Sequence, residues 1–287
     1  MVKSSHFIGQ SMEADQMKFT AEEQDKIFAE FAEKWQYDNV EEVKADGRTL
    51  LHCAAALGKI EIVKSLIETG ENINTQDKYG ATPLHVAAHE HVYGVSPNVE
   101  VVKYLVSAGA DVHAKDNDGD APLQYAVFYG CNAELTHFLV SVGSDVNAKH
   151  DRGDTLLHWA AAESPIEDIK FLIAAGANVN VKDNDGGTPL HWAGENNDVE
   201  VYKYLVFSGA DVHVKDNDGE TPFHKAVGWC SFWDNYEILQ FLVSKGVDIY
   251  AKNNAGNTPL DIAKDKGHAA MVEYLESIGA KFGSAVS

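Results

Sequence analysis

The chain has 287 residues, of which 45% are hydrophobic and 23% are charged, which is typical of a globular protein rather than a disordered or fibrous one. It carries 44 acidic against 23 basic residues, a net charge of −21, without a basic patch, so we expect no nucleic acid among its partners. No apolar run reaches the roughly 18 residues of a membrane span, and the first twenty residues hold no signal-peptide core. We therefore expect a soluble, cytoplasmic protein that does not contact membranes.

The cysteines support the same compartment. Cys53, Cys131 and Cys230 are odd in number and have no short paired spacing, so they predict neither a disulfide framework nor a Cys-x-x-Cys metal site. Free cysteines of this kind are typical of a reducing, intracellular environment.

The first predicted element is a helix in the N-terminal segment, residues 1–44. Thr20 and Glu23 have the spacing of a capping box, which predicts a helix over about residues 21–37. One face of this helix is apolar and includes Phe31. We expect that face to cover the first unit of the region that follows.

Residues 45–281 are an internal repeat, because variants of the phrase D-G-x-T-P-L-H return seven times. The glycine of the phrase stands at Gly47, Gly80, Gly119, Gly153, Gly186, Gly219 and Gly256. The separations are 33, 39, 34, 33, 33 and 37 residues, a period of 33 with two insertions. The predicted units start near residues 45, 78, 117, 151, 184, 217 and 254, and residues 282–287 form a tail.

The sequence pattern of each unit predicts two helices and a finger, the short segment that leads into the next unit. The Thr-Pro of the phrase is a typical helix start, since threonine caps the first turn and proline suits the next position. A second segment, such as VEVVKYLV, has one apolar helical face and ends before a glycine. One unit cannot bury that face alone, so the units must stack. The sequence predicts an all-α solenoid with short β-hairpin or turn fingers between its helix pairs.

The unit resembles the ankyrin repeat, a β-turn followed by two helices. The resemblance implies seven stacked ankyrin-like repeats behind an N-terminal capping helix, acting as a monomeric, non-catalytic module that binds protein partners through its concave face. It also implies that the histidine of the phrase ties neighbouring fingers together.

Positions that differ between the seven copies are free for recognition, and the resemblance places them on the concave face. The candidate contact residues are Tyr79, Asp118, Asp120, Phe128, Tyr129, Arg152, Asp154, Glu163, Asp185, Glu195, Asp218, Glu220 and Trp229. Most of them are acidic, which favours a basic partner, and the aromatic residues are typical of binding anchors.

Catalytic and metal sites have weak support in this sequence. The stretch from Asp116 to Gly119 imitates an EF-hand loop, but the twelfth position is Val127 instead of a bidentate glutamate. Cys53 follows His52 in a helix slot that we expect to be packed in the core, which does not favour a nucleophile. We expect no catalytic residue, no metal and no cofactor.

Two other functions stay open. Asn147 and Asn180 resemble ankyrin asparagines that an oxygenase hydroxylates, so the chain could be a modified substrate or a regulatory array. The phrasing of the repeats also resembles host-directed bacterial effectors, which would be secreted into a host cell. The aromatic insertion at residues 228–236 either packs on the solenoid or forms a second binding patch.

Overall fold

The computed structural model describes residues 19–89, 98–128, 133–196, 198–230 and 236–283, apart from the side chains of Phe128 and Cys230. In these ranges the chain forms sixteen α-helices and no strand, so the predicted all-α solenoid is confirmed. None of the helices in the described part is both long enough and apolar enough to cross a membrane.

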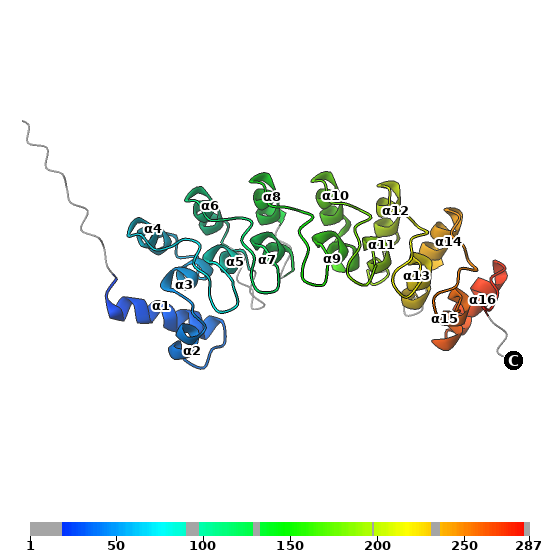
Figure 1. Cartoon of the computed structure of the whole chain (residues 1–287), viewed down its shortest axis with the longest axis horizontal. Helices are drawn as coiled ribbons and strands as arrows, with labels where there is room; N and C mark the ends of the chain where they lie inside the picture. Colours follow the sequence, from blue (N-terminus) through cyan, green and yellow to red (C-terminus); the bar gives the residue numbers. More distant parts are fainter. Residues whose placement is uncertain (1–18, 90–97, 129–132, 197, 231–235, 284–287) are drawn as a thin grey trace, which may run out of the picture.

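Helices α1 (Ala21–Lys34) and α2 (Val40–Ala45) precede a row of helix pairs. The first helices of the pairs are α3 (Leu50–Ala56), α5 (Pro83–Ala88), α7 (Pro122–Phe128), α9 (Leu156–Glu163), α11 (Pro189–Trp192), α13 (Pro222–Cys230) and α15 (Pro259–Asp265). The second helices are α4 (Ile60–Glu68), α6 (Val99–Ser107), α8 (Ala133–Ser141), α10 (Ile166–Ala174), α12 (Val199–Phe207), α14 (Tyr236–Ser244) and α16 (Ala269–Ser277). The two sets form two rows along a shallow arc, with the first helices on its inner side (Figure 1).

The histidine of the phrase connects consecutive repeats, as predicted. In repeat five the backbone N–H of Thr188 donates to Nδ1 of His191 at 3.1 Å, so the ring proton sits on Nε2. That Nε2 lies 3.2 Å from the carbonyl oxygen of Glu220 in repeat six and donates to it. The equivalent pairs are His52 with Ala81, His85 with Asp120, and His158 with Gly187.

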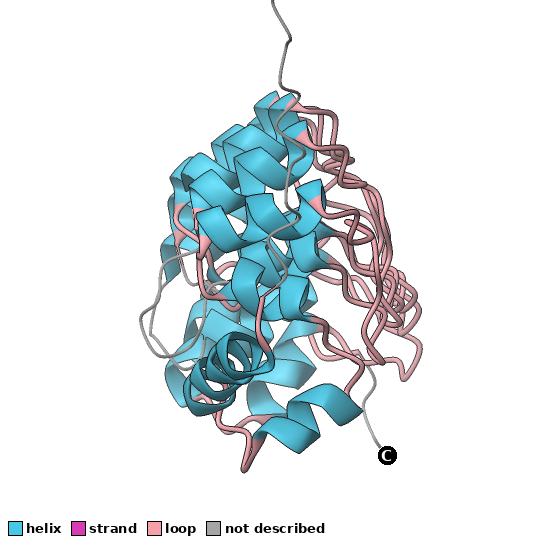
Figure 2. Ribbon diagram, turned by 90° about the vertical axis from the view of Figure 1, so that its left-hand side faces the viewer, coloured by secondary structure: helices cyan, strands magenta, loops and turns pink. Residues whose placement is uncertain are grey.

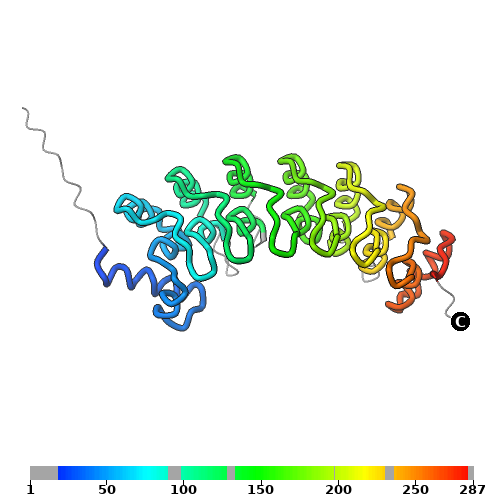
Figure 3. Tube along the Cα trace, in the orientation of Figure 1, coloured from blue at the N-terminus to red at the C-terminus, as the bar shows by residue number. Residues whose placement is uncertain are grey.

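Of the two forms that we predicted for the fingers, β-hairpins or turns, the described residues show turns. Within one finger the N–H of Asp183 donates to the carbonyl of Gly187 at 2.9 Å and closes a turn. Between fingers, the backbone N–H of Asn217 donates to Asp185 at 2.8 Å, and its side chain donates to the carbonyl of Asn184 at 2.9 Å. The fingers therefore lie side by side along one edge of the solenoid (Figures 2 and 3).

A continuous apolar core runs between the two rows of helices. Each second helix places one buried leucine at the same position of the repeat: Leu66, Leu105, Leu139, Leu172, Leu205, Leu242 and Leu275. Each first helix packs against the first helices before and after it and against the second helix of its own pair. Contacts are therefore between neighbours, as expected for a solenoid.

The N-terminal segment differs from its prediction in one respect. Helix α1 ends at Lys34 instead of residue 37, because the chain turns at Gln36, whose φ is 57°. A short second helix, α2, then leads into the first repeat. The apolar face of α1 packs on α3, and Phe31 is fully buried there, stacked on Trp35 at 4.4 Å.

Deleting residues 1–40 should expose the flank of α3 that α1 covers. The guanidinium of Arg48 lies 5.0 Å from the ring of Phe31, so the deletion also removes its aromatic neighbour. We expect a lower melting temperature and concentration-dependent self-association, because a terminal repeat needs a polar outer face. Thermal unfolding and light scattering would measure both. A monomeric truncated chain with unchanged stability would mean that α1 is a dispensable appendage.

Candidate functional site

The inner face of the solenoid carries a row of side chains that the sequence analysis missed. They occupy the position after the phrase's histidine: Cys53, Val86, Tyr125, Trp159, Trp192, Lys225 and Ile262. We expected core packing at this position, and Cys53 is indeed fully buried. The middle four are only partly buried and reach the fingers. A signal was available, because the copies differ at this position, whereas all seven have alanine directly after it.

Members of this row are held by finger carboxylates. The hydroxyl of Tyr125 donates to Asp116 at 2.7 Å, and the indole N–H of Trp192 donates to Asp183 at 2.8 Å. The indole of Trp159 donates to Asp154. These bonds fix aromatic rings among carboxylates along the inner face.

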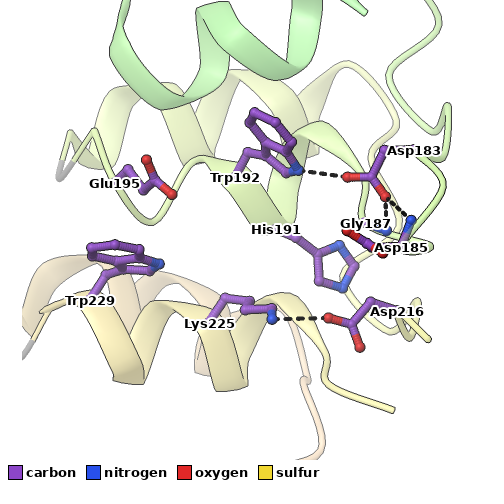
Figure 4. Close-up of a pocket in the computed structure, with 9 residues that line it drawn as sticks. All are labelled: Asp183, Asp185, Gly187, His191, Trp192, Glu195, Asp216, Lys225 and Trp229. Carbon is purple, nitrogen blue, oxygen red and sulfur yellow. Dashed lines mark hydrogen bonds and ion pairs between the residues drawn. The ribbon is translucent and has the colours of Figure 1, made fainter. Parts of the chain in front are cut away.

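A pocket of about 260 Å³ opens on this face between α11 and α13 (Figure 4). Its lining consists of Asp183, Asp185, Gly187, His191, Trp192, Glu195, Asp216, Lys225 and Trp229. Four of these side chains are carboxylates, and Lys225 is the only lysine or arginine among them. The indoles of Trp192 and Trp229 supply its apolar surface.

The pocket exists because the first helix of repeat five is cut short. Helix α11 ends at Trp192, and the chain continues in turns through Gly194 and Glu195. Repeats one to four and six have alanine or valine at the position of Gly194, and repeat seven has Lys264. A Cβ atom there would lie 2.7 Å from Cδ1 of Trp229, so the glycine allows that indole to approach.

The carboxylates of the pocket are not equally balanced by positive charge. Burial alone would lower the pKa of Lys225, but its hydrogen bonds to Glu220 and Asp216, at 2.8 and 3.1 Å, outweigh burial and raise that pKa. Lys225 is therefore engaged with these two acids. Partial burial raises the pKa of Glu195, and the nearby carboxylate of Glu163 adds to the shift. A cation beside Glu195 would relieve both effects.

Most of the predicted contact residues lie at the surface. The exposed ones are Tyr79, Asp118, Arg152, Glu163, Asp185, Glu195, Asp218 and Trp229. Glu220 is half-buried and paired with Lys225. Of these, the pocket brings together Asp185, Glu195 and Trp229.

Asp120 and Asp154 differ from the expectation, because both are buried. Burial raises the pKa of Asp120 to about 6, against the opposing effect of His150. Asp154 holds the indole of Trp159. Both carboxylates are enclosed by their fingers and are not part of the surface that we consider for binding.

Several predicted features lie outside the described residues. They include Tyr129, the side chain of Phe128 and residues 231–235 of the aromatic insertion. The start of that insertion is described, because α13 continues to Cys230 and carries Trp229 into the pocket on the inner face.

The two asparagines considered for hydroxylation brace consecutive repeats. The side-chain amide of Asn147 donates to Gly176 at 3.0 Å, and its oxygen accepts from the N–H of Asn178 at 2.8 Å. Asn180 makes the same pair of bonds with Gly209 and Asp211. These bonds account for the recurrence of asparagine, and its modification stays a prediction.

Within the described ranges, no three histidine, cysteine, aspartate or glutamate side chains gather closely enough to hold a metal ion. The inner face instead carries aromatic rings, carboxylates and the pocket between α11 and α13.

Stacked helix pairs joined by turn fingers define a helical repeat protein. The family model described as ankyrin repeats (three copies) matches residues 20–116, 93–183, 123–216 and 190–285. The chain therefore belongs to the ankyrin-repeat family. Ankyrin repeats are protein-interaction modules.

Short segments of the chain are similar to three curated proteins. Human Rabankyrin-5 is 53% identical over 47 residues, which are 16% of this chain and 4% of that protein. Rat protein phosphatase 1 regulatory subunit 12A is 41% identical over 71 residues, 23% of this chain and 7% of that protein. The variola virus ankyrin repeat protein OPG189 is 36% identical over 58 residues, 20% of this chain and 10% of that protein. The chain spans a tenth or less of each relative.

Proposed function

We propose that this chain is a non-catalytic module that binds a basic protein partner through the inner face of its first helices and fingers. The observation that carries the proposal is the row of partly buried aromatic side chains that finger carboxylates hold on that face. Rigid aromatic rings in a polar surround are typical of residues that dominate binding energy.

Charge supports a basic partner. Asp118, Asp185 and Asp218 are exposed at equivalent positions of three fingers, and the whole chain has a net charge of −21. Acids of this kind speed the encounter with a basic surface without holding the complex once it has formed. Burial raises the pKa of the Cys53 thiol to about 12, which fits an unreactive core cysteine in a non-catalytic module.

The length of the face also supports this function. Seven units at helix spacings of about 8–10 Å give a face on the order of 60 Å long. That length accommodates an interface of standard size or an extended peptide.

Replacing Asp118, Asp185 and Asp218 with asparagine should slow association with the partner about threefold to tenfold at low salt and flatten its salt dependence. The partner would first be captured with the native chain and purified. Association and dissociation rates would then be measured at two salt concentrations.

The matched control removes the same charge from the outer row. Glu134, Glu167 and Glu200 are exposed on second helices, and their replacement by glutamine changes the net charge equally. The control should keep most of the native association rate, because the partner meets the inner face. Equal slowing by both triple variants would contradict the inner face as the binding site.

A further inference from the structure

Repeat four contains an arginine site filled by the chain itself. The guanidinium carbon of Arg152 lies 5.4 Å from the ring of Trp159, within the range of a cation–π contact. Nε of Arg152 lies 3.8 Å from Asp154, which also accepts the indole N–H of Trp159. A tryptophan, a carboxylate and a guanidinium are thus combined on the inner face.

Repeat five also has a tryptophan held by a finger carboxylate, but the carboxylate comes from an earlier position of the finger and there is no guanidinium. Trp192 takes the position of Trp159, and its indole is again held by a carboxylate, that of Asp183. Asp185 takes the position of Arg152, so an acid stands where repeat four has its cation. Among the described residues, no lysine or arginine forms a cation–π contact with Trp192.

In repeat five, a cavity lies where repeat four has the guanidinium of Arg152. Figure 4 shows Trp192 and Trp229 on one side of the pocket and the acidic finger on the other. Gly194 allows the close approach of Trp229. Glu195, which stands between Trp192 and Trp229 in the sequence, lines the same pocket. In the described part of the chain, the backbone N–H of Glu195 donates to the carbonyl of Trp192, but its carboxylate makes no hydrogen bond or ion pair. The pocket therefore offers aromatic rings and unbalanced negative charge.

We propose that this pocket binds one arginine side chain of the protein partner, in the place that Arg152 fills in repeat four. The inference rests on the proposed function, since it names what the inner face recognises. Arginine is favoured over lysine because its planar, weakly hydrated guanidinium stacks on indoles and pairs with carboxylates through two N–H groups.

The test uses three capped pentapeptides, Gly-Ser-X-Ser-Gly, in which X is arginine, lysine or citrulline. Each would be titrated into the full chain while the indole N–H signals are followed by nuclear magnetic resonance. We expect the arginine peptide to shift the Trp192 and Trp229 signals with a dissociation constant in the millimolar range. The uncharged citrulline peptide should bind about tenfold more weakly, because the cation–π contact and the charge-assisted bonds are lost together.

The decisive variant is Asp185→Arg. It introduces the residue that repeat four has at this position, so the chain itself supplies the guanidinium. It should weaken binding of the arginine peptide at least about tenfold while leaving every other lining residue in place. Asp118→Arg makes the same charge change at the equivalent position of repeat three. This control should lower the affinity less than about threefold, through long-range charge alone.

Two further variants probe the wall itself. Glu195→Gln should weaken arginine binding about threefold to tenfold, because it removes the unbalanced charge. Gly194→Ala should weaken binding by moving the indole of Trp229, and it keeps the charge of the pocket. Alanine is the residue of other repeats at this position, so the variant should fold.

The inference is overturned if Asp185→Arg and Asp118→Arg weaken binding equally, or if citrulline or lysine binds as well as arginine. It is also overturned if the arginine peptide leaves both indole signals unchanged. None of these results contradicts the proposed function, which the rates of the asparagine variants test with a whole protein partner.

Discussion

Leu139→Ala should lower the free energy of unfolding by about 2–5 kcal/mol, the range for removing a fully buried leucine and leaving a cavity. Leu139 lies in α8 and is fully buried in the core between the two rows of helices. Leu205 takes the same position in α12 and should show a loss of the same size. Urea denaturation of each variant would measure it.

The same variants should lose stability locally first. Each repeat contacts its neighbours, so amide hydrogen exchange should quicken in the mutated repeat and the two beside it before the far end of the row changes. Leu275→Ala is the matched control, because this leucine is equally buried but lies in α16, the last helix described. Its effect should spread toward the N-terminus only. Uniform loss of protection in the Leu139 variant would contradict nearest-neighbour stability.

The sequence predicted the helix pairs well because each pair is specified by local signals that recur. Thr-Pro marks the start of a first helix four times, and the second helices repeat one apolar face. Helix α2 was missed because its six residues lie outside the repeating phrase. The sequence left open whether the fingers are hairpins or turns. Consecutive fingers are joined by hydrogen bonds between repeats, and these bonds cannot be predicted from the sequence of one finger.

The candidate site was less predictable, for a physical reason. Comparison of the copies identified exposed finger acids such as Asp185, but it also selected Asp154, which is buried and accepts the indole N–H of Trp159. The pocket depends on Gly194 and Trp229, which belong to different repeats and meet only when those repeats stack. Variation between copies therefore indicated candidate surface positions, but not which of their side chains meet in space.

The five histidines of the phrase should make the fold sensitive to mild acid. Burial lowers the pKa of His52, His85, His158, His191 and His224 below the ordinary value of 6.5. In His158, as in His191, Nδ1 accepts the N–H of the preceding threonine, so a proton added there would break that bond. The folded chain therefore holds these rings neutral.

The sign of the pH dependence follows from this shift. Well above pH 6.5 the rings are neutral in both states and the histidines do not make stability depend on pH. As the pH falls through 6.5, the unfolded chain takes up protons that the folded chain resists, so stability falls until the lowered pKa is reached. Within that window each histidine reduces the free energy of unfolding by up to about 1.4 kcal/mol per pH unit.

Repeat three supplies the variant that tests this account. Gln124 takes the place of the histidine, accepts the N–H of Ala121 at 3.1 Å and donates to the carbonyl of Ala148 at 3.4 Å. Glutamine thus caps its own helix and reaches the next repeat without a titrating group, at Ala148 instead of the carbonyl that the histidines bind. His158→Gln combined with His191→Gln should fold at pH 7.5 and should lose less stability than the native chain on acidification.

The difference between the two chains should grow by up to about 2.8 kcal/mol per pH unit below pH 6.5, twice the value for one histidine. Urea denaturation at half-unit steps from pH 7.5 to 5 would measure it. Replacing His113 and His213 with glutamine is the matched control, because both histidines are exposed on the fingers. This double variant should keep the pH dependence of the native chain. If both double variants followed the native curve, acid sensitivity would come from groups other than the histidines that join the repeats.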